Sequence, residues 1–324
     1  MSTKSGLSDT DRRIIGCLQI EPRVSWRRVS EVIGVPERTV ARRGAQLLAA
    51  RIVVVTGLAA HGESILVRAR CADGMARTVA RSLAQRDDVT FSYVVTGSTD
   101  CVAELICPPH ALTQLLLDEL PGIPGIEACS SEPILRYFRT VAQWEPVLLT
   151  DDEAAALRGD VEMPAHPEGT SAPVFDNVER LIVNALRQDG RCTTEELARV
   201  AGVSESTARR RVDELRGRGH IVLRSVIEPA AIGLPVEAML WVRTAPQHVG
   251  RVGEALTACP EVRYVAATMG AHQIVVDVAV SDKAAMYGFL ASHPWLEHVT
   301  SVESSLVVAP LKRSGVAVSA HSRV

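Results

Sequence analysis

Residues 34–47 read GVPERTVARRGAQL, and residues 202–215 read GVSESTARRRVDEL. Each stretch opens with a Gly-Val pair typical of a tight turn. A helix is expected to follow from Pro36 and after Ser204, because proline suits the first helical turn and serine caps a helix start. In both helices small and branched apolar residues form one face, while arginine and threonine lie on the other. With a shorter amphipathic helix before each turn, the pattern predicts two helix-turn-helix units.

The basic outer face of each second helix predicts contact with double-stranded DNA. Arginine pairs bidentately with guanine or phosphate, and threonine suits phosphate or base edges. The candidate DNA-binding residues are Arg38, Thr39, Arg42 and Arg43 in the first copy and Ser206, Thr207, Arg209, Arg210 and Arg211 in the second. Nine arginines oppose three glutamates between Arg12 and Arg51, whereas acids offset most arginines of the second copy, so unequal contributions are expected. The alternative is that these arginines only form solvated helix faces.

The similarity between the two halves extends along the chain. An offset of 168 positions pairs Arg23 with Arg191, and an offset of 173 then pairs Gly97 with Gly270. The change of offset falls around residues 57–63, where a loop between two subdomains tolerates a length difference. The chain is therefore interpreted as two fused copies of one unit, each made of two parts.

The second part of each copy shows the order strand, helix, strand, strand, helix, strand, which is the ferredoxin-like arrangement. Two helices cover one face of such a sheet, and the open faces of the two copies are expected to pack together. Short β stretches at residues 52–55 and 221–223 are expected to form the wing of each helix-turn-helix. The expected strands are 65–71, 89–96, 101–107 and 126–138 with helices 75–86 and 109–120 in copy one, and strands 237–244, 262–269, 274–280 and 299–308 with helices 247–258 and 282–292 in copy two.

Residues 141–174 separate the copies and hold four prolines and seven acids against a single arginine. Thr150 to Glu153 resembles a capping box that opens a short helix, with Gly159 closing it. The remainder is predicted to be a solvated linker that its acidity keeps off nucleic acid. The expected domains are 1–57 winged helix-turn-helix 1, 63–140 sensing domain 1, 141–174 linker, 175–228 winged helix-turn-helix 2, 235–313 sensing domain 2 and 314–324 flexible tail.

Composition narrows the class of protein. Hydrophobic residues make up 47% of the 324 positions, and the net charge is −3. Neither a signal peptide nor an apolar run long enough to span a bilayer is evident, so a cytoplasmic protein without membrane contact is expected. The seven cysteines are scattered without a CxxC pair, which favours reduced thiols over a metal site or disulfides. No metal and no cofactor are expected.

The chain resembles the Lrp/AsnC family (leucine-responsive regulatory protein and relatives). Residues 202–215, the following Gly219-His220-Ile221-Val222 and the segment Glu228 to Gly233 carry the resemblance, which covers both copies and leaves mainly the linker and tail. It implies an α+β fold with two copies of a winged helix-turn-helix and a ferredoxin-like sensing domain. It also implies a sequence-specific DNA-binding transcriptional regulator, with one chain acting as an internal pseudo-dimer and further homo-oligomers forming through the sensing domains.

The resemblance places an amino-acid or other small-metabolite effector at the elbows between the second and third strands. These elbows are Gly97, Ser98, Thr99 and Asp100 in copy one and Gly270, Ala271, His272 and Gln273 in copy two. Asp100 offers an acceptor for an ammonium group, which Gln273 provides only weakly. The alternative is that both elbows are simple tight turns that use glycine.

Two other functions were weighed. Sirohaem decarboxylases resemble this family, but their chemistry needs His together with Arg or Tyr on the second strand. Neither copy has a His there, and only Tyr93, Arg263 and Tyr264 could serve. The chain is therefore expected not to be an enzyme. A protein-interaction module whose DNA head no longer binds remains the third possibility, and it predicts no salt-sensitive affinity for DNA.

Overall fold

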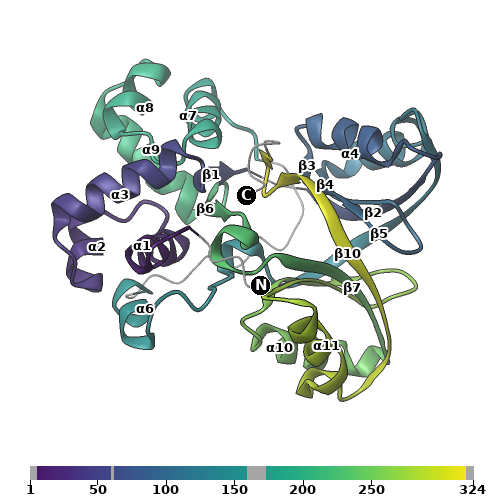
Figure 1. Ribbon diagram of the computed structural model, residues 1–324. Helices are drawn as coiled ribbons and strands as arrows, with labels where there is room; N and C mark the ends of the chain where they lie inside the picture. Colours follow the sequence, from purple (N-terminus) through teal and green to yellow (C-terminus); the bar gives the residue numbers. More distant parts are fainter. Residues whose placement is uncertain (1–5, 60–61, 159–172, 319–324) are drawn as a thin grey trace.

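The computed structural model describes residues 6–59, 62–158 and 173–318. Figure 1 shows two helical heads lying side by side on one side of the molecule and β-sheets flanked by helices on the other. No helix in these ranges is long and apolar enough to cross a membrane.

Each head contains the two predicted helices on either side of the turn and a further helix before them. Capping boxes of Ser8 with Asp11 and of Asp176 with Glu179 open this first helix in each head. Gly34 and Gly202 end the second helices with φ of 65° and 69°, a backbone conformation that favours glycine. The helices are α1 (Asp9–Ile20), α2 (Trp26–Ile33) and α3 (Glu37–Ala49) in the first head and α7 (Asn177–Gln188), α8 (Thr194–Ala201) and α9 (Glu205–Gly217) in the second.

The prediction of a separate wing on each head is wrong. Strand β1 (Val53–Leu58) pairs antiparallel with β6 (Val222–Ile227), so the two heads share one two-stranded sheet. Val53 lies opposite Ile227 and Leu58 opposite Val222, a register that is the same when read from either head. Each head supplies a single strand, whose backbone N–H and C=O groups need partners, and the strand of the other head provides them.

The α/β parts follow the expected element order with two departures. Residues predicted to begin a flexible tail at 314 instead form the short strand β11 (Val316–Ala317), which pairs with β10 (Val299–Arg313). Where the sequence predicted one helix over 109–120, the structure has three short pieces, η1 (Pro109–Ala111), α5 (Leu112–Gln114) and the π-helical η2 (Leu115–Glu119). The other elements of copy one are β2 (Glu63–Cys71), α4 (Ala76–Gln85), β3 (Val89–Val95), β4 (Cys101–Cys107) and β5 (Ile126–Arg139). Those of copy two are β7 (Val236–Thr244), η5 (Pro246–His248), α10 (Val249–Thr257), β8 (Val262–Thr268), β9 (Ile274–Val280), α11 (Lys283–Ser292), η6 (Pro294–Leu296), β10 (Val299–Arg313) and β11 (Val316–Ala317).

The two sheets are joined through their longest strands. Within each copy the strand order is β5-β2-β4-β3 or β10-β7-β9-β8, and β5 also pairs with β8 while β10 also pairs with β3. A core that includes Leu66 and Tyr93 of copy one and Trp241 and Tyr264 of copy two fills the space between the sheets. The expected packing of the two open sheet faces is therefore confirmed.

The first half of the predicted linker is folded rather than solvated. Segment η3 (Val141–Gln143) and helix α6 (Asp151–Arg158) follow β5, and Trp144 and Leu157 are buried in the core of the first head. The Thr150 and Glu153 capping box is present, with the Thr150 amide 3.0 Å from Glu153 Oε2. Glu153 also forms an ion pair with Arg13 of α1. Apolar contacts thus override the acidic composition up to residue 158, while Gly159 and the rest of the predicted linker up to residue 172 lie outside the described residues.

Candidate nucleic-acid interface and ligand site

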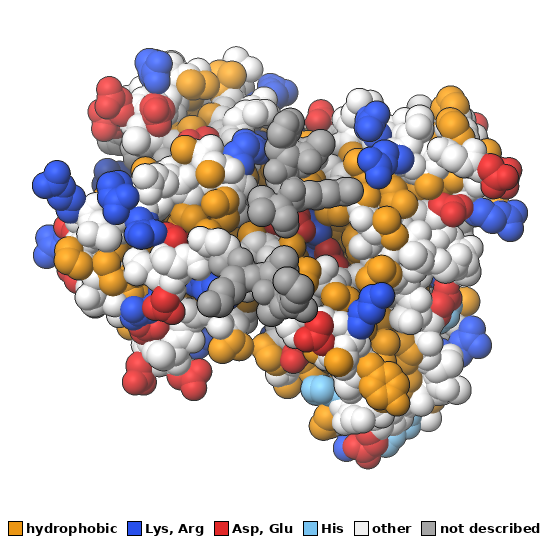
Figure 2. Space-filling model, in the orientation of Figure 1, with side chains coloured by type: hydrophobic (Ala, Val, Ile, Leu, Met, Phe, Trp, Pro, Cys, Tyr) orange, Lys and Arg blue, Asp and Glu red, His pale blue; other side chains and the backbone are white. Residues whose placement is uncertain are grey.

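The outer faces of α3 and α9 carry most of the predicted DNA-binding residues. Arg38 and Arg42 of the first head are exposed, and so are Ser206, Arg209 and Arg210 of the second. Thr39 and Thr207 are half-buried near the start of their helices. Figure 2 shows lysine and arginine side chains projecting from the surface over α2 and α3.

Two of the predicted DNA-binding arginines face inward instead. Arg43 Nη1 lies 2.9 Å from Asp11 Oδ1, and the equivalent Arg211 Nη1 lies 3.1 Å from Glu179 Oε1, with a further pair to Asp176 at 2.9 Å. Burial tends to raise the pKa of Asp11, but hydrogen bonds from Ser8 and Arg43 outweigh it and lower this pKa. These arginines therefore tie the recognition helix to the capping box of the first helix. The same ion pair occurs in both heads, at an offset of 168 residues.

The two recognition helices differ in the charges that surround their exposed arginines. In α9, Arg210 pairs with Glu214 at 2.7 Å, and Asp213 is exposed beside it. In α3, the partner of Arg42 among the described residues is the neutral Gln46, at 3.3 Å. The first head therefore offers the more positive face, as the sequence predicted.

A reciprocal pair of arginines joins the heads, and sequence reasoning missed it. Arg23 donates to the carbonyls of Gly190 and Cys192 at 3.0 and 2.8 Å, while Arg191 donates to those of Pro22 and Val24 at 2.8 and 3.0 Å. The donors and acceptors of one set are the equivalents of the other at an offset of 168, so the heads are related as in a symmetric dimer. The only signal in the sequence was that Arg23 and Arg191 match away from the recognition helices.

Gly44 of α3 has a packing role next to this joint. A Cβ atom at Gly44 would lie 2.4 Å from Cη2 of Trp26. The guanidinium of Arg191 lies over the ring of the same tryptophan, 4.5 Å from its centroid. The missing side chain thus lets Trp26 pack under α3 and meet the other head.

The predicted effector elbows form turns with a shared structural role. Asp100 Oδ2 accepts a hydrogen bond from the Cys71 amide at 2.7 Å, and Gln273 Oε1 accepts one from the equivalent Thr244 amide at 3.2 Å. Gly97 has a φ of 106°, which favours glycine. Asp100 and Gln273 therefore close the ends of β2 and β7.

Both elbows meet at Glu303 of β10. Ser98 of the first elbow donates to Glu303 Oε1 at 2.5 Å, and His272 Nε2 of the second lies 3.7 Å from Glu303 Oε2. Arg68 also pairs with Glu303 at 2.5 Å, and its guanidinium lies 4.1 Å from the ring centroid of Trp241. The side chains of both copies therefore form one joint cluster rather than two separate sites.

Several buried polar atoms in this joint cluster lack a hydrogen-bond partner among the described residues. They are Arg68 Nε, Glu132 Oε2, His272 Nδ1 and Ser305 Oγ. Ser305 Oγ lies 3.0 Å from where a Cβ of Gly97 would be, and Glu132 Cγ lies 2.8 Å from where a Cβ of Gly270 would be, so one residue of this set packs on the glycine of each elbow. Burial raises the pKa of Glu132, opposed by Arg68. Because unpaired buried polar atoms are costly, these groups are suited to a polar ligand or ordered water. We call Arg68, Ser98, Glu132, His272, Glu303 and Ser305 the elbow cluster.

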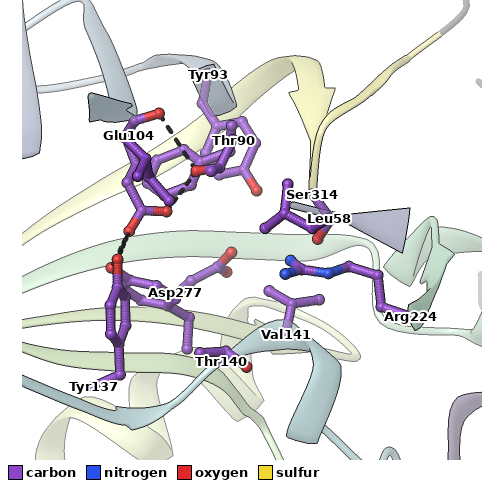
Figure 3. Close-up of a pocket in the computed structure, with 13 residues that line it drawn as sticks. Leu58, Thr90, Tyr93, Glu104, Tyr137, Thr140, Val141, Arg224, Asp277 and Ser314 are labelled. Atoms are coloured by element: carbon purple, nitrogen blue, oxygen red, sulfur yellow. Dashed lines mark hydrogen bonds between the residues drawn. The ribbon is translucent and has the colours of Figure 1, made fainter. Parts of the chain in front are cut away.

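A decarboxylase could use only Tyr93, Arg263 and Tyr264 on the second strands. These three side chains lie between the sheets. Tyr264 donates to Glu104 at 3.0 Å, and Arg263 pairs with Asp277 at 2.9 Å. Tyr93, Tyr264, Glu104 and Asp277 line a cavity of about 30 Å³, shown in Figure 3. This volume holds about two water molecules and is far too small for a tetrapyrrole. Within the described ranges there is no cluster of three or more metal-ligating side chains.

Comparison with known proteins agrees with this architecture. The family model described as the AsnC-type helix-turn-helix domain matches residues 7–48 and 175–216, and the Lrp/AsnC ligand binding domain model matches residues 237–317. An uncharacterised HTH-type transcriptional regulator of Pyrococcus horikoshii is 33% identical over 140 residues, covering 43% of this chain and 89% of the relative. The HTH-type transcriptional regulator AldR of Mycolicibacterium smegmatis is 28% identical over 167 residues, covering 49% of this chain and 96% of the relative.

A solved structure matches both copies together. The siroheme decarboxylase NirDL superposes with a TM-score of 0.61 at 12% identity, covering 94% of this chain and 93% of that one. At this identity the likeness shows a shared fold alone. The sequence relatives match less than half of this chain over nearly their own full length, as two fused copies require. The chain therefore belongs to the Lrp/AsnC family.

Proposed function

We propose that this protein is a sequence-specific DNA-binding transcriptional regulator in which one chain acts as an internal pseudo-dimer. The observation that carries the proposal is the reciprocal arrangement of two helix-turn-helix heads, joined by the β1–β6 pair and by Arg23 and Arg191. A joint of this kind sets the relative position of two recognition helices, which is how symmetric dimers read two half-sites on one face of DNA.

The two half-sites differ, because the recognition helices differ. The first head contacts DNA through Arg38, Thr39 and Arg42, and the second through Ser206, Thr207, Arg209 and Arg210. Arg43 and Arg211 act indirectly, since their ion pairs hold each recognition helix in place. The more positive first head contributes more of the salt-dependent affinity.

The α/β parts are two ferredoxin-like sensing domains that share one effector site at the elbow cluster. The unpaired atoms of Arg68 and His272 are donors for a carboxylate, and those of Glu132 are acceptors for an ammonium group. An amino acid or similar metabolite is the ligand that fits this set. The domain boundaries follow the sequence division, except that residues 141–158 belong to the first head and β11 extends the second sensing domain to Ala317. Larger homo-oligomers form through the sensing domains.

An enzyme of the sirohaem decarboxylase type is the second candidate, because the fold likeness to NirDL spans both copies. The small cavity around Tyr93, Arg263 and Tyr264 argues against it, since each of these groups is already engaged within a closed core.

Selection of bound fragments from a genomic DNA library by the full chain, with and without a mixture of amino acids, tests the proposal. Enrichment of a two-part site is the expected result, and a shift in the enriched set with amino acids supports the effector role. Equal recovery of all fragments at near-physiological salt would refute sequence-specific binding. A bound pigment in the purified protein would instead favour the enzyme.

A further inference from the structure

A group of ionisable side chains joins the DNA-binding heads to the sensing sheets. Arg224 comes from β6, one of the two paired strands of the heads, and Glu228 follows directly after that strand. Figure 3 shows the Arg224 side chain reaching from its strand toward Asp277 of β9. The other charged members come from the sensing sheets, and they are Glu104 of β4, Glu237 of β7, Arg263 of β8 and Arg313 of β10. We call these seven residues the ionic cluster.

Carboxyl groups outnumber arginines in the ionic cluster by one. Three arginines face four carboxyl groups, and six of the seven side chains are buried, while Glu228 is half-buried. The tyrosines around the cluster add no charge, because burial raises the pKa of Tyr93, Tyr137 and Tyr264 above the ordinary value of 10. A buried charge without an opposite charge is costly. The cluster is therefore electrically neutral when one of its four carboxyl groups holds a proton.

Asp277 accepts fewer hydrogen bonds from arginine than the two glutamates next to it. Glu237 accepts hydrogen bonds from Arg313 Nη1 and Nη2, each at 2.5 Å, and a further one from Arg263. Both carboxylate oxygens of Glu228 accept from Arg313, at 3.1 and 3.2 Å. Asp277 uses Oδ2 for Arg263 at 2.9 Å, and its Oδ1 has no hydrogen-bond partner among the described residues.

Glu104 occupies the position in copy one that Asp277 occupies in copy two, at the offset of 173, but its surroundings differ. It accepts hydrogen bonds from the hydroxyl groups of Thr90, Tyr137 and Tyr264. Hydrogen bonds donated to a carboxylate favour its charged form. Glu104 is therefore satisfied as an anion, and Asp277 is the carboxyl group best placed to hold the proton.

The electrostatics of the cluster point to the same carboxyl group. Burial raises the pKa of Glu237, but Arg313 and Arg263 outweigh it and lower this pKa. Burial also raises the pKa of Asp277, where Arg263 opposes the rise and Glu237 adds to it. Burial lowers the pKa of Arg224 to about 10, so this arginine stays charged at neutral pH. Asp277 is thus the group whose charge changes first.

We propose that Asp277 is a proton-binding site that controls how firmly the heads are held on the sensing sheets. With the proton bound, the ionic cluster is neutral and the heads are held as the structure shows. Loss of the proton leaves one excess negative charge in a buried joint, which favours opening of the joint to water. Arg224 limits this cost because it is the cation across the cavity from Asp277. The site is separate from the elbow cluster.

Infrared spectroscopy of the full chain over a pH series tests the proposal, because a protonated carboxyl group and a carboxylate absorb at different frequencies. The wild type is expected to keep a protonated carboxyl band well above pH 3.8, the ordinary pKa of aspartate, and Asp277→Asn is expected to lose that band. The matched control is Glu132→Gln, which removes a buried carboxyl group of the elbow cluster whose pKa is also raised. This control is expected to retain the band of Asp277.

Two further variants test the charge count in opposite directions. Glu228→Gln removes the excess acid, so the Asp277 band is expected to disappear at a pH about one unit lower. Arg224→Gln removes a cation, so the band is expected to persist to a pH about one unit higher. Circular dichroism checks that each variant is folded. If Arg224→Gln fails to fold, the half-buried Glu228→Gln decides the charge count alone.

Hydrogen exchange of the β1 and β6 amides measures the joint itself. Relative to Asp277→Asn, the protection of these amides in the wild type is expected to fall as the pH rises, by at most tenfold per pH unit for one proton. The proposal is overturned if the band is absent from the wild type or persists in Asp277→Asn, if Glu228→Gln does not lower its midpoint, if folded Arg224→Gln does not raise it, or if this relative protection does not change with pH. These measurements use no DNA, so DNA binding is judged separately by fragment selection.

Discussion

Arg42 and Arg43 are neighbours on α3 and have the same chemistry, but the structure predicts opposite consequences for their removal. Arg42 is exposed and, within the described part of the chain, hydrogen-bonded only to Gln46 on its own helix. The side chain of Arg43 is 33% exposed and pairs with Asp11, whose side chain is 12% exposed. Replacing each by alanine therefore separates contact with DNA from support of the head.

The magnitudes follow from these environments. Arg42→Ala should change the free energy of unfolding by less than about 0.5 kcal/mol, as surface substitutions usually do. Arg43→Ala should lower it by about 1–2 kcal/mol, because the partly buried pair is worth more than an exposed ion pair and less than a fully buried one. If Arg42 neutralises one phosphate, its loss should reduce the slope of log K against log salt by about 0.9.

Two measurements on the same preparations test whether Arg42 contacts DNA and Arg43 supports the head. Urea unfolding gives the stability of each variant, and fluorescence anisotropy with a mixed-sequence duplex over a salt series gives the slope. Arg43→Ala should retain a wild-type slope at temperatures where the head is folded. A wild-type slope in Arg42→Ala, combined with a reduced slope in stable Arg43→Ala, would refute the assignment of these two side chains.

Three further results are expected. Gly44→Ala should destabilise the protein by about 1–2 kcal/mol despite the better helix propensity of alanine, because the new Cβ displaces Trp26; a more stable variant in urea unfolding would contradict this packing. Arg23→Ala should lower stability by about 2–3 kcal/mol by leaving carbonyls of the other head unpaired, whereas the exposed Arg38→Ala serves as a neutral control. Because the pKa of Asp11 is lowered in the folded protein, its carboxylate stabilises the fold at pH values above the ordinary pKa of 3.8, and this stabilisation is lost as the pH falls through the folded-state pKa. Asp11→Asn should therefore flatten the acidic side of a plot of unfolding free energy against pH. An unchanged acidic side would show that the ion pair is not responsible.

The helices and strands were largely predictable because their signals are local. The Ser8 and Asp176 caps and the turns at Gly34 and Gly202 each depend on a few neighbouring residues. The internal repeat added the domain plan, since the same pattern occurs twice and its offset changes from 168 to 173 where one part of each copy ends and the next begins.

Contacts between distant segments were not predictable from these patterns. A single strand after each recognition helix resembles half of a wing, and only the partner strand shows that β1 and β6 pair. The ion pair of Arg43 with Asp11 joins residues whose roles, recognition helix and helix cap, each had a sufficient local explanation. The elbow cluster depends on Glu303, which lies in a strand with no motif around it.

The central claim is that two unlike heads in one chain each read their own half of a DNA site. Footprinting on a selected site tests it most directly, with Arg38→Ala/Arg42→Ala in the first head compared with Arg209→Ala/Arg210→Ala in the second. We predict two protected half-sites on one face of the duplex, with each double variant losing protection of a different half. Loss of both halves to the same extent in the two variants, or a single undivided footprint, would contradict it.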